Sequence, residues 1–481
     1  MPPQLAASPG APPVPTPNPA PNPAVSTPAA TGGGAKSHAA LLGIADEITR
    51  QVAAMRGLPQ KAQFQRGVLS RAEIVQKLHE RMAKEYSKEE VRIESAVLRR
   101  LGLLPEGVDY EQTLLDLLGE QVAGFYDPYA TTLYIADWLP LEMQRPALAH
   151  EIEHALQDQH FDLKKFSQAF KDDGDRQLAR SSIVEGDGTA LMLEYTTRDS
   201  GHSAAQIAEE VARLGKQMMQ LSMGATPIFQ KAPPALRETL VFPYTSGLEF
   251  VTARRLGAAG AQGGTPSWKR VDELFRDPPD STEQILHPEK YEVRERPVRI
   301  TAAPLTSLAP RKEARRDVMG ELIWRLWFDS QLSVAQATDA AAGWGGDRLV
   351  AYEGPGDALP AVINLSAWDS DADANEAEAA ARKVLMILAG QKEPSGSSSS
   401  SSGHSSSVGP AGLFREKGGV SFGLVRRGRL LLIVAGIPKG TEARVTDEVF
   451  GTFKVEWPPP AAPPPPAAAP AAPAPATRKP R

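Results

Sequence analysis

The stretch LAHEIEHALQDQHFDL, residues Leu148–Leu163, holds three of the chain's 8 histidines together with four carboxylates. Neither proline nor glycine interrupts residues 147–160, so this stretch is predicted to be an α-helix. Residues four apart share one face of a helix and lie one turn from each other. His150 and His154 are therefore predicted to point the same way from one helix.

The residues from His150 to His154 form the pattern H-E-x-x-H. Two imidazoles at this spacing can bind one Zn²⁺, with N–Zn distances of about 2.0–2.1 Å. Glu151 lies beside them, where a carboxylate can take a proton from water that the metal activates. A surface helix can also carry this pattern by coincidence. A third ligand is therefore needed to distinguish a metal site from such a helix.

Glu185, within SSIVEGDGTALMLEY, is the preferred third ligand. It follows His154 by 31 residues, which is enough for a loop and an antiparallel return helix, and its neighbours are apolar. An unpaired buried carboxylate is costly, and a metal is one of the few partners that offset this cost. Gly186 and Gly188 weaken a helix, which suits the close approach of another backbone. The alternative is an ion pair within the helix, with Arg180.

His160 is the alternative third ligand. It completes the spacing H-E-x-x-H-x-x-x-x-x-H of the metzincins, but Gln157 stands where that motif has the glycine that lets the chain leave the helix. On a continuous helix, His160 would lie about 9 Å further along the axis than His154. Two histidines and Glu185 would instead form the His₂Glu set, which leaves a fourth position for water.

The whole composition excludes several kinds of protein. The chain has 481 residues, of which 41% are hydrophobic and 23% charged, as in ordinary globular proteins. A net charge of −5 gives no electrostatic reason to expect a nucleic acid as partner. No run approaches the ~20 apolar residues of a transmembrane helix. The chain has no cysteine, which excludes thiol catalysis, disulfides and thiolate metal sites.

The chain is predicted to be an α+β protein with two folded parts. Residues 38–300 are expected to form a mostly helical, zincin-like domain with a small sheet, and residues 301–455 a smaller α+β domain with a Ser-rich insertion at 394–408. Residues 1–37 and 456–481 are Pro/Ala-rich and are predicted to be disordered tethers. The compartment stays open. An envelope-tethered or secreted protein is expected if the N-terminus was trimmed, and a cytoplasmic one otherwise.

Periodicity predicts the individual elements. In the first part these are a β-hairpin, with strands within 122–127 and 131–137, and helices at 175–195, 204–223 and 248–256. In the second part they are helices at 317–328 and 372–390 and strands at 348–354, 361–368, 420–426 and 429–436.

Residues 57–380 resemble an uncharacterised bacterial family of zinc metallopeptidases of the gluzincin type. The motifs that carry the resemblance are GFYDP, HALQDQHFDL, VEGDGTALM, FPYTSG, STEQILHPEKY and AAGWGGDR, and the first three are specific in combination. The resemblance implies one Zn²⁺ per chain, with His150, His154 and Glu185 as ligands and Glu151 as general base.

One position departs from the gluzincin pattern. Many gluzincins have an aspartate four residues after the ligand glutamate, where it orients a ligand histidine, but this chain has Thr189 there. Asp187, two residues after Glu185, is the candidate for that orienting role.

These features predict a metallopeptidase that hydrolyses polypeptide with water activated by the metal. Tyr244, His287 and Tyr291 are the candidates for stabilising the oxyanion. The predicted hairpin is a candidate to pair with an extended substrate. The alternative is a non-catalytic, zinc-stabilised module of the bacterial envelope that binds protein partners. Hydrolysis of a non-peptide amide is a third possibility, and the oligomeric state is not predicted.

Overall fold

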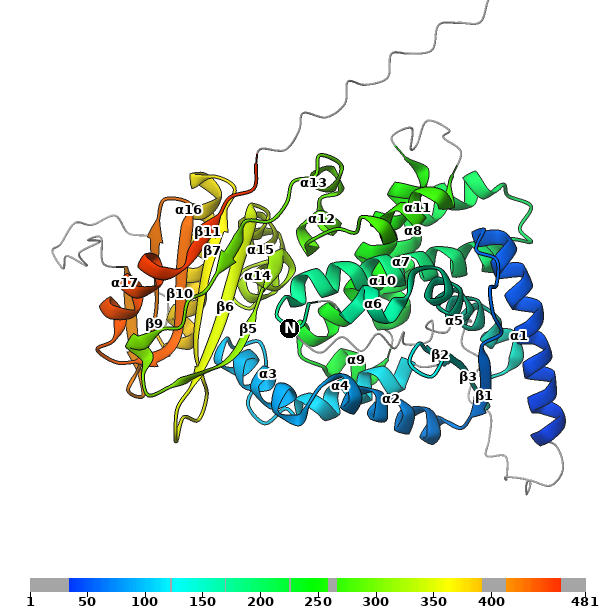
Figure 1. The fold of residues 1–481 in the computed structure, drawn as a ribbon, viewed down its shortest axis with the longest axis horizontal. Helices are drawn as coiled ribbons and strands as arrows, with labels where there is room; N and C mark the ends of the chain where they lie inside the picture. The colour runs from blue at the N-terminus through cyan, green and yellow to red at the C-terminus, as the bar shows by residue number, and fades with distance from the viewer. Residues whose placement is uncertain are drawn as a thin grey trace, which may run out of the picture.

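A helical part and a six-stranded sheet make up the chain, and one hydrophobic core joins them (Figure 1). The predicted α+β class is therefore confirmed. The predicted tethers lie almost entirely outside the described residues, and the Ser-rich insertion lies wholly outside them. The computed structural model describes residues 34–121, 123–168, 170–224, 226–257, 266–391 and 412–459.

The helical part contains most of the helices and a three-stranded sheet. Its helices are α1 (Gly34–Arg56), α2 (Arg71–Glu85), α3 (Lys88–Arg100), α4 (Tyr110–Gln121), α5 (Leu141–Phe161), α6 (Leu163–Gln168), α7 (Gly174–Thr197), α8 (Ala204–Gly224), α9 (Pro227–Lys231), α10 (Pro234–Leu256), α11 (Trp268–Arg276), α12 (Thr282–Leu286) and α13 (Pro288–Glu292). Its strands are β1 (Gln65–Leu69), β2 (Gly124–Asp127) and β3 (Thr132–Ala136).

The three-stranded sheet has the order β1-β3-β2 and lies beside α5. Strands β2 and β3 pair antiparallel, which confirms the predicted hairpin, while β1 pairs parallel with β3. Strand β2 therefore ends the sheet, and its outer edge has no strand partner among the described residues.

Two helices are longer than predicted. Helix α5 begins at Leu141, six residues before the stretch 147–160 predicted to be helical, so Pro146 lies inside it. Proline removes one backbone hydrogen bond, and the rest of α5 continues to Phe161, after which Asp162 takes a left-handed conformation with φ 55°. Helix α10 was predicted only at 248–256, yet it begins at Pro234 and includes Pro243.

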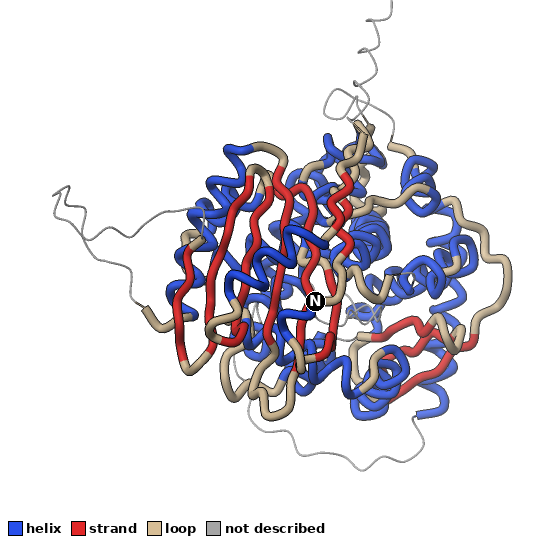
Figure 2. The backbone as a smooth tube through the Cα atoms, turned by 60° about the vertical axis from the view of Figure 1, so that its left-hand side comes forward, coloured by secondary structure: helices blue, strands red, loops and turns tan. Residues whose placement is uncertain are grey.

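Figure 2 shows the strands of the six-stranded sheet side by side in red. The sheet is antiparallel throughout, with the order β5-β6-β7-β10-β9-β8. The four predicted strands are confirmed within it, with small changes in their bounds. The strands are β5 (Lys312–Asp317), β6 (Trp344–Glu353), β7 (Ala361–Trp368), β8 (Leu413–Lys417), β9 (Val420–Arg427) and β10 (Leu430–Pro438).

Both faces of this sheet are covered. Alternate residues of β10 enter different clusters: Leu431 and Ile433 join the core shared with the helical part, while Leu432 and Val434 join a second core. Helices α14 (Gly320–Asp329), α15 (Val334–Ala341) and α16 (Asp371–Leu388) contribute to the shared core. The opposite face carries α17 (Glu442–Thr452), the 3₁₀ helix η2 (Thr306–Leu308) and the strand pair β4 (Arg299–Thr301) and β11 (Lys454–Glu456).

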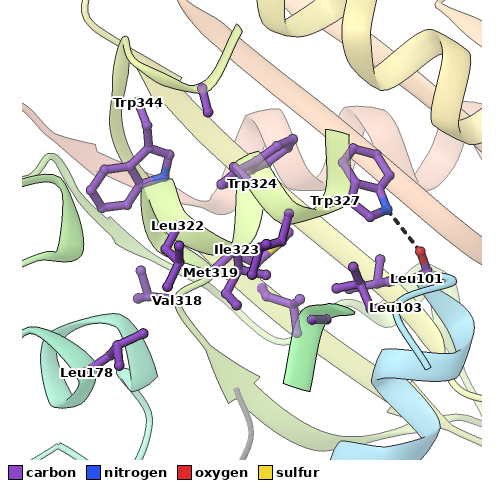
Figure 3. Packing of buried hydrophobic residues seen from close by; sticks show 14 of the residues in the cluster. Leu101, Leu103, Leu178, Val318, Met319, Leu322, Ile323, Trp324, Trp327 and Trp344 are labelled. Carbon is purple, nitrogen blue, oxygen red and sulfur yellow. Dashed lines mark hydrogen bonds between the residues drawn. The ribbon is translucent and has the colours of Figure 1, made fainter. Parts of the chain in front are cut away.

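Helix α14 forms the junction between the two parts (Figure 3). Trp324 and Trp327 are fully buried on it, with ring centroids 5.4 Å apart, and Trp324 also packs edge-on against Trp368 of the sheet. Trp327 donates a hydrogen bond from Nε1 to the carbonyl of Leu101, which follows α3, at 3.0 Å. The boundary predicted near residue 300 therefore separates the mostly helical part from the part with the six-stranded sheet, but it does not divide the core.

Candidate metal centre

Helices α5 and α7 pack against each other and bring three polar side chains together. The Nε2 atoms of His150 and His154 are 3.0 Å apart. Glu185 Oε2 lies 3.2 Å from the first and 3.4 Å from the second. All three side chains are buried, with exposures of 1%, 3% and 6% for His150, His154 and Glu185. The structure thus joins the predicted ligand pair of α5 to the preferred third ligand on α7.

These three donor atoms fit a zinc ion. Ligand atoms held at about 2.0–2.1 Å around a tetrahedral zinc lie roughly 3.3–3.4 Å from one another. The observed separations of 3.0, 3.2 and 3.4 Å are close to that spacing. Two imidazole nitrogens and one carboxylate oxygen also form the donor set of catalytic zinc sites, which keep a fourth position open.

A second cluster of carboxylates does not fit a metal. Glu283, Glu295 and Asp369 also converge, but Lys290 Nζ already lies 2.6, 3.0 and 2.5 Å from their oxygens. The ammonium group supplies the positive charge there. That cluster is therefore an ion-pair network.

The two glycines next to Glu185 allow the close packing that their positions predicted. A Cβ at Gly186 would lie 2.3 Å from the carbonyl oxygen of Gly247 on α10. A Cβ at Gly188 would lie 2.9 Å from His150 Cε1 and 3.2 Å from His154 Cε1. The absence of a side chain at these positions lets α10 and both histidine rings approach the backbone of α7.

Glu151 is completely buried beside the three-residue cluster. The backbone N–H of Tyr126, on β2, donates to its Oε2 at 2.8 Å. Its Oε1 has no hydrogen-bond partner among the described residues. Burial raises the pKa of Glu151 to about 8, against the opposing effect of the nearby His154. One carboxylate oxygen is thus fixed by the edge strand and the other is available to a proton.

The pKa values of the cluster reflect mutual pairing. Burial lowers the pKa of His154, but the adjacent Glu185 carboxylate outweighs this effect and raises it to about 9. Burial likewise raises the pKa of Glu185, yet the two histidines more than offset this and hold it well below its usual range. The Glu185 side chain is therefore a carboxylate, the form that binds a cation.

Asp187 is connected to His154, a candidate ligand, through Gln157. His154 Nδ1 lies 2.8 Å from Gln157 Oε1, and Gln157 Nε2 donates to Asp187 Oδ2 at 2.9 Å. Asp187 also accepts two hydrogen bonds from Arg56, at 2.8 Å and 3.0 Å. Any orienting effect of Asp187 on His154 would therefore act through Gln157, and that role stays a prediction.

Of the three predicted oxyanion candidates, only Tyr244 lies at the cluster. Its ring, on α10, stacks on His150 with centroids 6.1 Å apart. His287 pairs with Glu321 of α14 at 2.9 Å, and the Tyr291 hydroxyl donates to the carbonyl of Asp277 at 2.7 Å. The structure therefore places His287 and Tyr291 in other contacts, because short helices α12 and α13 face α14 and the end of α11.

His160, the alternative ligand, lies in the last turn of α5, where its Nε2 is 2.8 Å from the carbonyl of Pro59. Among the described residues it is not part of the cluster that could hold a metal. The continuous helix carries it past His154, as the helical rise predicts.

Sequence reasoning missed Arg56, Glu153 and Gln157. Gln157 follows His154 by three residues, a spacing that places both on one face of α5, so its contact could have been found. Glu153 is fully buried and lies 3.3 Å from Arg56, and burial raises its pKa. Arg56 is 131 residues from Asp187, and no local pattern connects them.

Residues 306–446 match the model of a family described as "Domain of unknown function (DUF8575)". No curated protein and no solved structure matches the chain. Among the described helices, none is long and apolar enough to cross a membrane. The matched region comprises the six-stranded sheet with α14 to α16 and part of α17, and it excludes every residue of the candidate metal centre.

Proposed function

We propose that this protein is a zinc-dependent metallopeptidase, with His150, His154 and Glu185 as the zinc ligands. The observation that carries the proposal is the convergence of their three donor atoms within 3.0–3.4 Å. Beside them lies the buried Glu151, whose Oε1 has no hydrogen-bond partner in the part of the chain that the structure describes. A surface helix that carried the histidines by coincidence would not bury them against a carboxylate from another helix.

Zinc at such a site supplies Lewis acidity, which makes water acidic enough to lose a proton near neutral pH and polarises a carbonyl group. Glu151 accepts that proton on Oε1, while the Tyr126 N–H holds Oε2 in place. A neighbouring cation would also lower the raised pKa of Glu151, which favours the carboxylate form that a base needs. Glu151 then passes the proton to the leaving amine.

The edge strand supports polypeptide as the substrate class. The Tyr126 N–H points from the outer edge of β2 toward Glu151, so this edge faces the proposed base. An extended peptide that pairs with β2 would lie beside Glu151 and the cluster. Tyr244, next to His150, is the candidate that could stabilise the developing oxyanion.

The proposal is tested by measuring zinc content and casein hydrolysis for wild type, Glu151→Gln, Glu185→Ala and His160→Ala. We expect one zinc per wild-type chain, and a loss of zinc in Glu185→Ala. Glu151→Gln should keep zinc but lose roughly 10²–10⁴-fold in hydrolysis. His160→Ala, a change at the end of the same helix, is the matched control and should keep both.

Zinc loss in His160→Ala but not in Glu185→Ala would overturn the ligand assignment. Tight zinc binding by wild type without hydrolysis of casein or other unfolded proteins would instead support the non-catalytic binding module.

A further inference from the structure

The side chain of Gln157 connects a candidate zinc ligand to a buried ion pair. It is completely buried, with Oε1 2.8 Å from His154 Nδ1 and Nε2 2.9 Å from Asp187 Oδ2. Its Nε2 also donates to the carbonyl of Val184 at 3.2 Å. Both ends of the amide are therefore engaged, one toward α5 and one toward α7.

The chemistry of these partners leaves one orientation for each group. The Val184 carbonyl can only accept a hydrogen bond, so the NH₂ group of Gln157 must face it, and the same group faces Asp187 Oδ2. Its oxygen then faces His154, and Nδ1 of that histidine must carry a hydrogen in order to donate to it. A neutral imidazole protonated on Nδ1 has its lone pair on Nε2, the atom that faces His150 and Glu185.

Arg56 holds the Asp187 side chain in place. Its guanidinium forms two hydrogen bonds with Asp187, and it also lies 2.8 Å from Asp272 of α11 and 3.3 Å from Glu153 of α5. The Arg56 side chain is fully buried at the C-terminal end of α1, and it lies 4.9 Å from the centroid of the Trp268 ring. Such a group is costly to bury, and the surrounding carboxylates offset that cost.

We propose that Arg56, Asp187 and Gln157 are positioning residues that hold His154 in the tautomer and ring orientation required to bind a metal through Nε2. This inference rests on the metal centre of the proposed function. By this proposal Arg56, the last residue of α1, belongs to the metal centre although it precedes Asp187 by 131 residues. Partners of this kind typically change metal affinity by about 10–100-fold when removed.

The experiment compares Gln157→Met, Arg56→Met, the double variant and Asp272→Asn with wild type in the full chain. Gln157→Met keeps the volume of the side chain but has neither donor nor acceptor. Asp272→Asn removes a charged partner of Arg56 outside the connection to His154, and it is the matched control. Circular dichroism confirms that each variant is folded, and competition with a chromophoric chelator gives the Kd for Zn²⁺.

We expect the Kd to rise about 10–100-fold in Gln157→Met and Arg56→Met, and to change by less than about twofold in Asp272→Asn. The Kd of the double variant should be little higher than that of the weaker-binding single variant, because both changes break the same connection between Arg56 and His154. If Arg56→Met does not fold, Gln157→Met alone decides the outcome. A Gln157→Met protein with the wild-type Kd would overturn the proposal.

A second readout needs neither zinc nor hydrolysis. Long-range ¹H–¹⁵N spectra of the zinc-free protein report which nitrogen of each histidine carries the hydrogen. They are recorded at about pH 10, because the raised pKa of His154, about 9, leaves the ring neutral only above that value. We expect the Nδ1–H form for His154 in wild type and a mixture of tautomers in Gln157→Met. An Nε2–H form in wild type would refute the positioning role of Arg56, Asp187 and Gln157, even if the protein is a peptidase. Zinc binding without hydrolysis would refute the proposed peptidase activity but leave the positioning role of these three residues intact.

Discussion

Gly188→Ala tests whether α7 holds the histidines of α5 in place, without changing any candidate ligand. The added Cβ would lie 2.9 Å from His150 Cε1, 3.0 Å from His150 Nδ1 and 3.2 Å from His154 Cε1. Non-bonded carbons prefer about 3.5–4.0 Å, so each ring would have to move by roughly 0.5 Å. Alanine favours a helix over glycine by about 1 kcal/mol, and overpacking costs about 1–3 kcal/mol. The free energy of unfolding should therefore fall by only about 0–2 kcal/mol.

The affinity for Zn²⁺ should fall more than the free energy of unfolding, because the displaced rings carry two of the three proposed zinc-binding atoms. We expect the Kd for Zn²⁺ to rise at least 10-fold, or about 1.4 kcal/mol, in chelator competition. Gly43→Ala is the matched control: it also adds a methyl group to a helix, α1, but its Cβ meets no atom within 4 Å. This control should gain up to about 1 kcal/mol in stability and keep the wild-type Kd. A Gly188→Ala protein that binds zinc as tightly as wild type would refute the reasoning.

Three further predictions concern stability. Burial raises the pKa of Asp173 to about 6, so the stability that its protonated form contributes is lost as the pH rises from about 4 through 6. In urea denaturation, the free energy of unfolding of Asp173→Asn should therefore equal that of wild type below pH 4 and exceed it above pH 6 by on the order of 1–3 kcal/mol. Equal free energies of the two proteins at both pH values would contradict this. Chelation should lower the Tm, since zinc at 1,000 times its Kd adds about 4 kcal/mol, and an unchanged Tm in scanning calorimetry would argue against a bound metal. Trp327→Phe should lower the free energy of unfolding by about 1–3 kcal/mol, because the buried carbonyl of Leu101 loses its hydrogen-bond donor. Trp457→Phe, at a position that is 41% exposed, is the control and should change this free energy little. Similar losses in both variants would contradict the prediction.

The sequence predicted those parts of the fold that show a local signal. The helix of the histidine motif has no proline or glycine between residues 147 and 160, and the central strands of the large sheet are short apolar runs. The beginning of α10 was missed, because Pro243 and the small residues after it have low helix propensity and form a helix only against their neighbours. Packing at the junction with α14 could not be predicted either, since periodicity identifies a buried face but not what covers it.

The candidate site was also predictable only in part. The spacing of four residues within one helix pointed to His150 and His154, and the apolar neighbours of Glu185 pointed to a buried carboxylate. Gln157 was recognisable in principle by its distance of three residues from His154, but it was considered only as the residue that replaces the glycine of the metzincin motif. Arg56 was not recognisable, because its contacts with Asp187 and Glu153 exist only once α1 has packed against α5 and α7.

The shared core around α14 has a consequence for how the chain can be divided. The region that matches a family model, residues 306–446, contains Trp324 and Trp327 but not Leu101 or the other helical residues that cover α14. Expressed alone, it would present this tryptophan face to water and would lose β4 and β11 from its other side. The stretch of sequence that similarity delimits is therefore smaller than the hydrophobic core to which it belongs. Helix α14 packs on one side against β6 and on the other against α7, which carries Glu185 of the candidate metal centre.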